Sequence, residues 1–290
     1  MPAVLSSMSP LPMRAADGGW LVLSLAFVLG ACIGSFLNVC IHRLPQDESV
    51  LRPASRCPHC AAPIAWRDNI PLLSWLLLGA RCRACRAPIP ARYPLVEAAT
   101  GGLAVLALAG FGPSATAVVA FLFTAALLLV TFVDLDHRFI PDEVSLPGIV
   151  AGIAAAFLPG PPTPADALAG SLVGGGVLWA VAAGYQWTTG VEGMGFGDVK
   201  LLAMIGAFLG WQAIPAVLVV ASLTGSLAGI ALIFTHRGRG RMARVARRLG
   251  AGALLSFVRR AARRTEIPFG PFLALGALVA LYAPGQNLLS

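Results

Sequence analysis

The sequence predicts an all-α, polytopic membrane protein with about eight transmembrane helices and a small cytoplasmic zinc-binding domain inserted after the first helix. Hydrophobic residues make up 57% of the 290-residue chain and charged residues only 12%, whereas a soluble domain carries about 25% charged residues. The mean hydropathy is +0.79. Long apolar runs alternate with polar segments, and the first large polar segment carries four cysteines.

Eight apolar runs are candidates for helices that cross a bilayer, which takes about 20 residues. They are Trp20–His42, Pro94–Phe111, Ala115–Val133, Val144–Leu158, Ala167–Trp187, Val199–Leu209, Trp211–Phe234 and Ile267–Ala283. The fourth and the sixth runs are short, and each follows a loop that bears acidic residues. We therefore expect broken or half-depth helices beside a functional site at these two places.

The distribution of basic residues predicts the orientation, because Lys and Arg concentrate in cytoplasmic loops. If the N-terminus lies outside and the spans alternate, every Lys and Arg except Arg14 falls on the cytoplasmic side. The net charge of +8 then indicates anionic lipid headgroups as a partner. Nucleic acid is not expected, because no aromatic residues are interleaved with the basic ones to form a binding groove.

Polar segments divide the chain into three predicted parts. Residues 1–42 hold the N-terminus and the first span, residues 43–93 form a small cytoplasmic domain, and residues 94–290 form the remaining membrane domain. Seven prolines exclude a long helix from residues 43–93, namely Pro45, Pro53, Pro58, Pro63, Pro71, Pro88 and Pro90. The basic segment 236–266 is either an amphipathic helix on the membrane surface or a disordered loop. No repeat of fixed period is expected.

Four cysteines form two C-x-x-C pairs, Cys57 with Cys60 and Cys82 with Cys85, separated by 21 residues. Each pair can present two thiolates from a tight turn, and two such turns complete a tetrahedral site for a structural Zn²⁺ ion. The alternatives are two disulfides or four free thiols, and a cytoplasmic location disfavours disulfides. A domain of about 50 residues with few apolar clusters needs such a cross-link.

Two aspartates at the ends of apolar runs are candidate catalytic residues. Asp134 directly follows the third run, and Asp198 opens the sixth within Gly195-Phe-Gly197-Asp198. An ionisable group at the edge of hydrocarbon is costly, so it is a functional candidate. The alternative is two unrelated acids at helix ends. Asp136, Asp142 and Glu143 are expected to lie further into the loop after Asp134.

Two carboxyl groups a few ångströms apart share one proton, because both cannot ionise cheaply. One then acts as a base on water while the protonated partner polarises a carbonyl, which is the chemistry of aspartyl peptide hydrolysis. Gly195 and Gly197 are expected to let backbone and substrate approach closely and to permit unusual torsion angles.

Several motifs together resemble the type IV prepilin peptidase family of GxGD-type aspartyl proteases. They are Gly34-Ser-Phe-Leu-Asn-Val-Cys-Ile-His-Arg-Leu-Pro45, the two C-x-x-C pairs, Asn69-Ile-Pro-Leu-Leu-Ser-Trp75, Arg92-Tyr-Pro-Leu-Val-Glu97, the Asp134 segment, Gly195-Phe-Gly-Asp-Val-Lys200 and Ile267-Pro-Phe-Gly-Pro-Phe-Leu-Ala-Leu-Gly276. The resemblance covers nearly all of the chain from Gly34 to Ala280.

This resemblance implies a bacterial inner-membrane enzyme that cleaves the basic leader from type IV prepilins or type II secretion pseudopilins at the cytoplasmic boundary. It also implies N-methylation of the new N-terminus with S-adenosylmethionine, although no methyl-donor pocket is recognisable in the sequence. By motif match the catalytic pair is Asp134 and Asp198, with Asp136 the less favoured partner, and residues 94–290 become the peptidase domain.

One motif departs from the family pattern and keeps alternatives open. Relatives usually have Arg-Gly before the third cysteine, where this chain has Gly79-Ala80-Arg81-Cys82. A peptidase without methyltransferase activity is therefore an alternative, with the zinc domain structural or substrate-recognising. A proton-coupled transporter is a distant alternative, because paired intramembrane acids and broken helices also occur there. Substrate identity and oligomeric state are left open.

Overall fold

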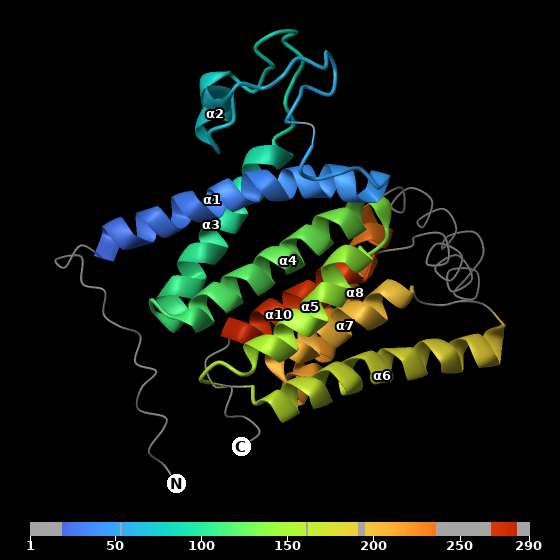
Figure 1. Ribbon diagram of the computed structural model, residues 1–290. Coiled ribbons are helices and arrows are strands. Elements are labelled where there is room, and N and C mark those ends of the chain that lie inside the picture. The colour runs from blue at the N-terminus through green and yellow to red at the C-terminus, as the bar shows by residue number, and fades with distance from the viewer. Residues whose placement is uncertain (1–18, 53, 161, 191–194, 236–267, 283–290) are drawn as a thin grey trace, which may run out of the picture. The chain divides into compact units, whose positions relative to one another are not determined.

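The computed structural model describes residues 19–52, 54–160, 162–190, 195–235 and 268–282 (Figure 1). The predicted basic segment 236–266 lies outside the described residues. The α-helices are α1 Gly19–Arg43, α2 Leu73–Leu77, α3 Arg92–Phe111, α4 Ala115–His137, α5 Asp142–Ala155, α6 Pro164–Thr189, α7 Phe196–Leu209, α8 Ile214–Thr235 and α10 Gly270–Tyr282. Each of the eight apolar runs coincides with one of these helices, which confirms the mostly helical class.

Five segments among the described residues are long and apolar enough to cross a membrane. They are Gly19–Gln46, Arg92–Phe111, Ala115–His137, Pro164–Thr189 and Trp211–Ala231. The other three helices, α5, α7 and α10, have 14, 14 and 13 residues. At 1.5 Å per residue such a helix is about 20 Å long, less than the 30 Å of hydrocarbon. The protein is therefore polytopic, while the count of eight spans stays a prediction.

The chain forms two compact units, Met1–Pro164 and Ala165–Ser290. The first unit contains α1 to α5 and the cysteine-bearing segment, and the second contains α6 to α10. Asp134 belongs to the first unit and Asp198 to the second. The predicted parts 1–42, 43–93 and 94–290 were defined by role, whereas the two units are defined by packing. The three-part division therefore stays a prediction.

In the first unit, α1 and α3 pack through glycines. A Cβ atom added at Gly34 would lie 2.7 Å from the Cα of Glu97, and one added at Gly30 would lie 2.7 Å from the Cβ of Ala104. Small residues let transmembrane helices approach this closely. Apolar side chains of α1, α3 and α4 then form one core, which comprises Leu37, Cys40, Ile41, Val96, Ala125, Leu129 and Val133.

Local signals set the ends of α4. The Ser114 hydroxyl caps its N-terminus by accepting a hydrogen bond from the Ala117 N–H at 3.2 Å, as N-cap serines do. Arg138 adopts a left-handed conformation with φ of 58° and donates its N–H to the Asp134 carbonyl at 2.9 Å. This C-terminal turn ends the helix at His137, three residues after Asp134.

In the second unit, glycines again set the helix spacing. A Cβ atom added at Gly206 of α7 would lie 2.1 Å from the carbonyl oxygen of Gly170 in α6. Gly276 of α10 meets the backbone of Val217 in α8, where an added Cβ would be 2.6 Å from the carbonyl oxygen. Asp166, near the start of α6, accepts hydrogen bonds from the side chains that follow α7, Trp211 and Gln212, at 3.2 and 3.1 Å.

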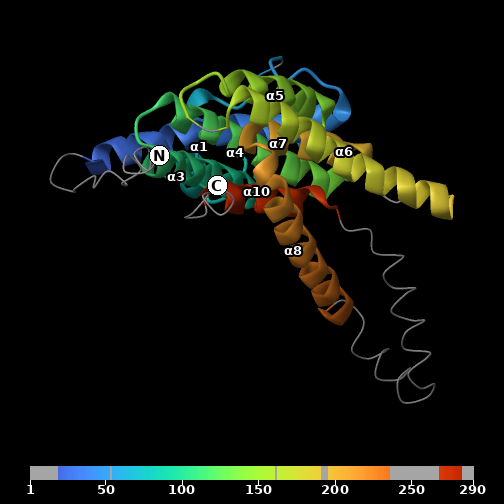
Figure 2. The same cartoon turned by 90° about the horizontal axis from the view of Figure 1, so that it is seen from below.

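The two halves of α8 have different surroundings. Its first half is packed, with Ile214, Val217 and Ala221 buried, whereas Leu223 and Leu227 are exposed. Figure 2 shows the C-terminal part of α8 extending away from α10. The packed half therefore positions α10, and the second half presents apolar side chains outward.

Candidate metal centre and candidate catalytic acids

The four predicted cysteines of the polar segment lie together, and we refer to them as the four-cysteine cluster. Their sulfur atoms are all within 4.8 Å of one another, and the Cys57 and Cys85 sulfurs are 3.9 Å apart. Four sulfurs placed about 2.3 Å from a tetrahedral zinc ion would be about 3.8 Å apart. Every cysteine of the chain is free, so the disulfide alternative is wrong. The cluster could hold a metal ion such as zinc.

Each cysteine pair lies on a turn, and the two turns have the same backbone hydrogen bonds. The Cys57 N–H bonds to the Ala62 carbonyl at 3.0 Å and the Ala61 N–H to the Cys57 carbonyl at 2.9 Å. The equivalent bonds occur 25 residues later. The Cys82 N–H donates to the Ala87 carbonyl at 2.8 Å, and the Arg86 N–H donates to the Cys82 carbonyl at 3.0 Å. Ala61 and Arg86 both have positive φ, 56° and 60°.

The expectation of no internal repeat is therefore wrong for this domain. The signal was present in the alignment of Cys-Pro-His-Cys-Ala-Ala-Pro-Ile64 with Cys-Arg-Ala-Cys-Arg-Ala-Pro-Ile89. Each half also closes with an antiparallel bridge, Arg56 with Pro63 and Arg81 with Pro88. We refer to residues 55–64 and 80–89 as the first and second knuckles.

The second knuckle favours a thiolate at Cys82. Backbone N–H groups of Cys85 and Ala84 hydrogen-bond to its sulfur and lower the pKa of Cys82 to about 7. The Ala87 N–H likewise favours the thiolate of Cys85, but desolvation and the thiols of Cys60, Cys82 and Cys57 raise the pKa of Cys85 to about 11. The pKa of Cys82 is lowered mainly by two backbone N–H donors. The pKa of Cys85 is raised because four sulfurs lie close together, and a bound cation would instead favour the thiolate of Cys85.

Residues between the knuckles hold the domain in shape. The Arg83 guanidinium binds both carboxylate oxygens of Asp68, at 2.7 and 2.6 Å, and this lowers the pKa of Asp68. The Trp75 indole N–H donates to the Ile89 carbonyl at 3.0 Å. The Ser74 hydroxyl donates to the Arg67 carbonyl at 3.1 Å. These contacts give α2 and its Asn69-to-Trp75 motif a structural role.

One hydrogen bond attaches this domain to α3, and another joins α1 to the start of α3. The carboxylate of Glu97, in the second turn of α3, accepts the Leu72 N–H at 2.7 Å. The side-chain amide of Asn38 in α1 donates to the Tyr93 carbonyl at 3.1 Å. Sequence reasoning recorded these residues only as parts of motifs. Their polar character inside apolar helices was the signal that they bind backbone groups.

The first candidate acid, Asp134, is buried in the last turn of α4. The prediction that Asp136 lies in the loop after Asp134 is wrong, because α4 continues through Asp136 to His137. Asp136 is part-exposed and forms an ion pair with Arg92, whose guanidinium carbon lies 5.2 Å from the centre of the Phe132 ring. Asp136 thus has a structural partner of its own on the helix surface.

The remaining loop acids are also helical. Asp142 and Glu143 form the first turn of α5 rather than a loop, where negative charge is favoured by the helix dipole. The loop between α4 and α5 is therefore short, from Arg138 to Pro141.

The second candidate acid, Asp198, lies in the first turn of α7 and is half-buried. Its N–H bonds to the Gly195 carbonyl at 3.2 Å. The expectation of unusual glycine torsions is wrong: Gly195 has φ of −70° and ψ of 142°, and Gly197 is helical. A Cβ atom at position 195 would meet nothing within 4 Å, so packing among the described residues does not require glycine there.

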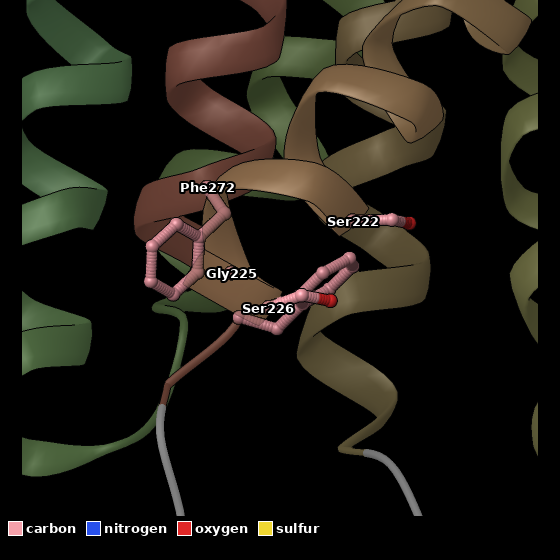
Figure 3. Close-up of a pocket in the computed structure, with 5 residues that line it drawn as sticks. Ser222, Gly225, Ser226 and Phe272 are labelled. Atoms are coloured by element: carbon pink, nitrogen blue, oxygen red, sulfur yellow. The ribbon is translucent and has the colours of Figure 1, made fainter. Parts of the chain in front are cut away.

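The second unit also contains a cavity of about 370 Å³, lined by Ser222, Gly225, Ser226, Phe269 and Phe272. Figure 3 shows the Phe272 ring beside Gly225, with the hydroxyls of Ser222 and Ser226 pointing away from that ring. Its lining offers hydroxyl groups and phenyl rings but no ionisable side chain, so it lacks the groups that acid–base catalysis needs.

The fold and these sites define a multi-pass membrane protein in which a domain with a four-cysteine cluster is inserted between the first two long helices. Two family models match the chain: the bacterial peptidase A24 N-terminal domain over residues 28–111 and the type IV leader peptidase family over residues 121–230. The chain belongs to the type IV leader peptidase family.

Curated relatives support this assignment over most of the chain. A protein of Aeromonas hydrophila is 41% identical over 286 residues, 90% of this chain and 91% of the relative. One of Burkholderia pseudomallei strain 1026b is 37% identical and covers 97% of this chain and 92% of its own. One of Myxococcus xanthus is 47% identical over 71% of this chain and 62% of its own. All three are named prepilin leader peptidase/N-methyltransferase. No solved structure matches the chain.

Proposed function

We propose that this protein cleaves the leader from prepilins or pseudopilins and N-methylates the new N-terminus. The observation that carries the proposal is the similarity along almost the whole chain to relatives named for both activities. The structure supports the proposal with two features that the sequence predicted for such an enzyme, namely helices able to cross a membrane and a four-cysteine cluster.

Asp134 and Asp198 are the proposed catalytic pair. One carboxylate accepts a proton from water as the water attacks the scissile carbonyl, while the other, protonated, donates a hydrogen bond to the carbonyl oxygen. Asp134 is buried in the last turn of α4, and Asp198 is half-buried in the first turn of α7.

The test uses full-length protein in vesicles with a prepilin substrate. Asp134→Asn and Asp198→Asn should each lower cleavage by at least about 1000-fold, since each removes one member of an acid–base pair. Asp136→Asn is the matched control and should retain most activity. Substantial cleavage by either of the first two variants, at normal protein level, would remove that residue from the pair. Equal loss in the control would shift the assignment to Asp136.

Zinc is the proposed occupant of the four-cysteine cluster, with Cys57, Cys60, Cys82 and Cys85 as ligands. Thiolate sulfurs at tetrahedral spacing favour zinc, which would supply a structural cross-link here and no redox chemistry. Purified protein should contain about one zinc per chain by elemental analysis, and Cys82→Ser should lose it. Wild-type protein purified without chelator and found free of zinc would contradict the proposal.

Methyl transfer would use S-adenosylmethionine as donor, as the relatives' name suggests. Ala80 stands where the family usually has a glycine, and its φ is 56°, a conformation that favours glycine. This departure gives weight to a peptidase-only alternative. Mass spectrometry of the processed prepilin distinguishes the two, because cleavage and methylation change the mass differently. A Cys57→Ser protein that cleaves without methylating would link the cysteine-bearing domain to methyl transfer alone.

The proposed location is the bacterial inner membrane, with the N-terminus outside and the cysteine-bearing domain and both acids on the cytoplasmic side. Arginine-rich flanks support this orientation through the positive-inside rule. Reporter fusions placed after Arg43 and after Phe111 should report opposite sides of the membrane.

A further inference from the structure

The residue that precedes the short helix α2 of the cysteine-bearing domain is hydrogen-bonded to a helix that is long and apolar enough to cross a membrane. Leu72, the residue before α2, donates its N–H to Glu97 at 2.7 Å. Glu97 is five residues into α3, which corresponds to about 7.5 Å along the helix axis. Since α3 has 20 residues, about 30 Å, it needs nearly its full length to cross the hydrocarbon. Its second turn is therefore in or against the bilayer, and α2 starts beside it (Figure 1).

The outward face of α2 is apolar. Leu73, Leu76 and Leu77 are spaced i, i+3 and i+4, so they share one face of the helix, and they are 48%, 66% and 77% exposed. The polar residue Ser74 instead is buried and bonded within the domain. A helix that faces water normally has the reverse pattern. The exposed leucines thus match a nonpolar surrounding.

The same domain and the start of α3 also expose side chains typical of a membrane interface. Trp66 is 83% exposed, and Tyr93 at the start of α3 is also exposed. Aromatic residues gather at the level of the lipid headgroups. Residues 43–93 contain eight arginines against three acids, Asp47, Glu48 and Asp68, and such an excess of positive charge suits anionic headgroups.

We propose that Leu73, Leu76 and Leu77 of α2, flanked by Trp66, insert into the cytoplasmic leaflet and anchor the cysteine-bearing domain to anionic phospholipid. The proposal names the residues that contact lipid, and it rests on α3 crossing the membrane, not on the catalytic roles of the two aspartates. Anchoring fixes the domain against the bilayer surface, so the Leu72–Glu97 hydrogen bond is shielded from water.

The test measures the depth of α2 in bilayers. A fluorescent amino acid replaces Leu77 in the full-length protein, and in a matched control it replaces His59, an exposed residue of the first knuckle. Both proteins are reconstituted in vesicles of phosphatidylethanolamine and phosphatidylglycerol. Lipids brominated in the acyl chains and aqueous iodide serve as the two quenchers. We expect brominated lipid to quench most of the emission at position 77 and iodide to quench the emission at position 59.

A second pair of proteins checks that the leucine face causes the insertion. With the fluorescent residue at position 73, Leu77→Asp should shift quenching from brominated lipid to iodide. Leu51→Asp, at an equally exposed position of the same domain, should leave quenching unchanged. Vesicles of phosphatidylcholine alone should weaken lipid quenching at position 73 if anionic headgroups contribute as proposed.

Two results would overturn the proposal. Iodide quenching at position 77 as strong as at position 59, without lipid quenching, would mean that α2 faces water. Protection from iodide only after a prepilin is added would mean that the leucines bind protein rather than lipid. Prepilin cleavage measured in the same vesicles tests the catalytic proposal separately. A protein that has lost cleavage activity would still show the same quenching of α2 by lipid.

Discussion

Gly206→Ala tests how tightly the spacing of α6 and α7 controls the proposed active site. The added Cβ atom would lie 2.1 Å from the Gly170 carbonyl oxygen and 2.4 Å from its carbonyl carbon, whereas real Cβ contacts do not fall below 3.0 Å. The two helices must therefore separate by roughly 0.9 Å, the difference between 3.0 and 2.1 Å. Both atoms are backbone, so no side-chain rotation relieves the clash.

The expected cost combines two opposing effects. Overpacking costs about 1–3 kcal/mol, and the higher helix propensity of alanine returns about 1 kcal/mol, which leaves a net loss of about 0–2 kcal/mol. Asp198 lies eight residues earlier on the same helix, about 12 Å along its axis. If α7 moves as a rigid rod, Asp198 is displaced by about 1 Å, which can lower cleavage by up to about 100-fold.

Thermal unfolding in detergent and prepilin cleavage in vesicles measure the two effects. Gly176→Ala is the matched control, because it makes the same change in α6 at a position where a Cβ atom meets nothing within 4 Å. The control should unfold at the same or a higher temperature and cleave normally. A Gly206→Ala protein as stable and active as this control would refute the close approach of the two helices.

Three smaller predictions follow from individual contacts. Asp136→Asn removes the part-exposed ion pair with Arg92 and should cost no more than about 1 kcal/mol in the free energy of unfolding. Arg83 lowers the pKa of Asp68, so this contact stabilises the fold above the unfolded pKa of about 3.9 and is lost as the pH falls through the lower folded value. The stability difference between wild type and Asp68→Asn should therefore shrink between about pH 6 and pH 3; a constant difference would contradict the pKa shift. Ala80→Gly should stabilise the protein by about 1 kcal/mol, because φ at this position is 56° and glycine adopts it without strain; a loss of stability would show that the Ala80 side chain is needed.

The sequence predicted the helices well because hydrocarbon forces every span to satisfy its own backbone hydrogen bonds. It also predicted the four-cysteine cluster, since two C-x-x-C pairs in a polar segment have few other uses. The ends of α4 and α5 were harder. Asp136 is charged, and it pairs with a distant residue, Arg92, just before the turn at Arg138 that ends α4. Asp142 is in the first turn of α5, where the helix dipole favours negative charge.

Contacts between distant segments were beyond sequence reasoning. Nothing in the order of residues showed that Glu97 accepts the N–H of Leu72, or that Gly206 faces Gly170, because these pairings depend on how the helices pack. The sequence shows that α2 is rich in leucine. Only the structure shows that its leucines are exposed and that its polar residue, Ser74, is buried. Asp134 and Asp198 remain predicted partners on the strength of their motifs and the family.

The twin knuckles have a consequence for how the domain responds to metal depletion. Each loop contributes two sulfurs, and neither can complete four-fold coordination alone. An ion held by all four sulfurs would join the two loops, so its removal by a chelator would release both loops together.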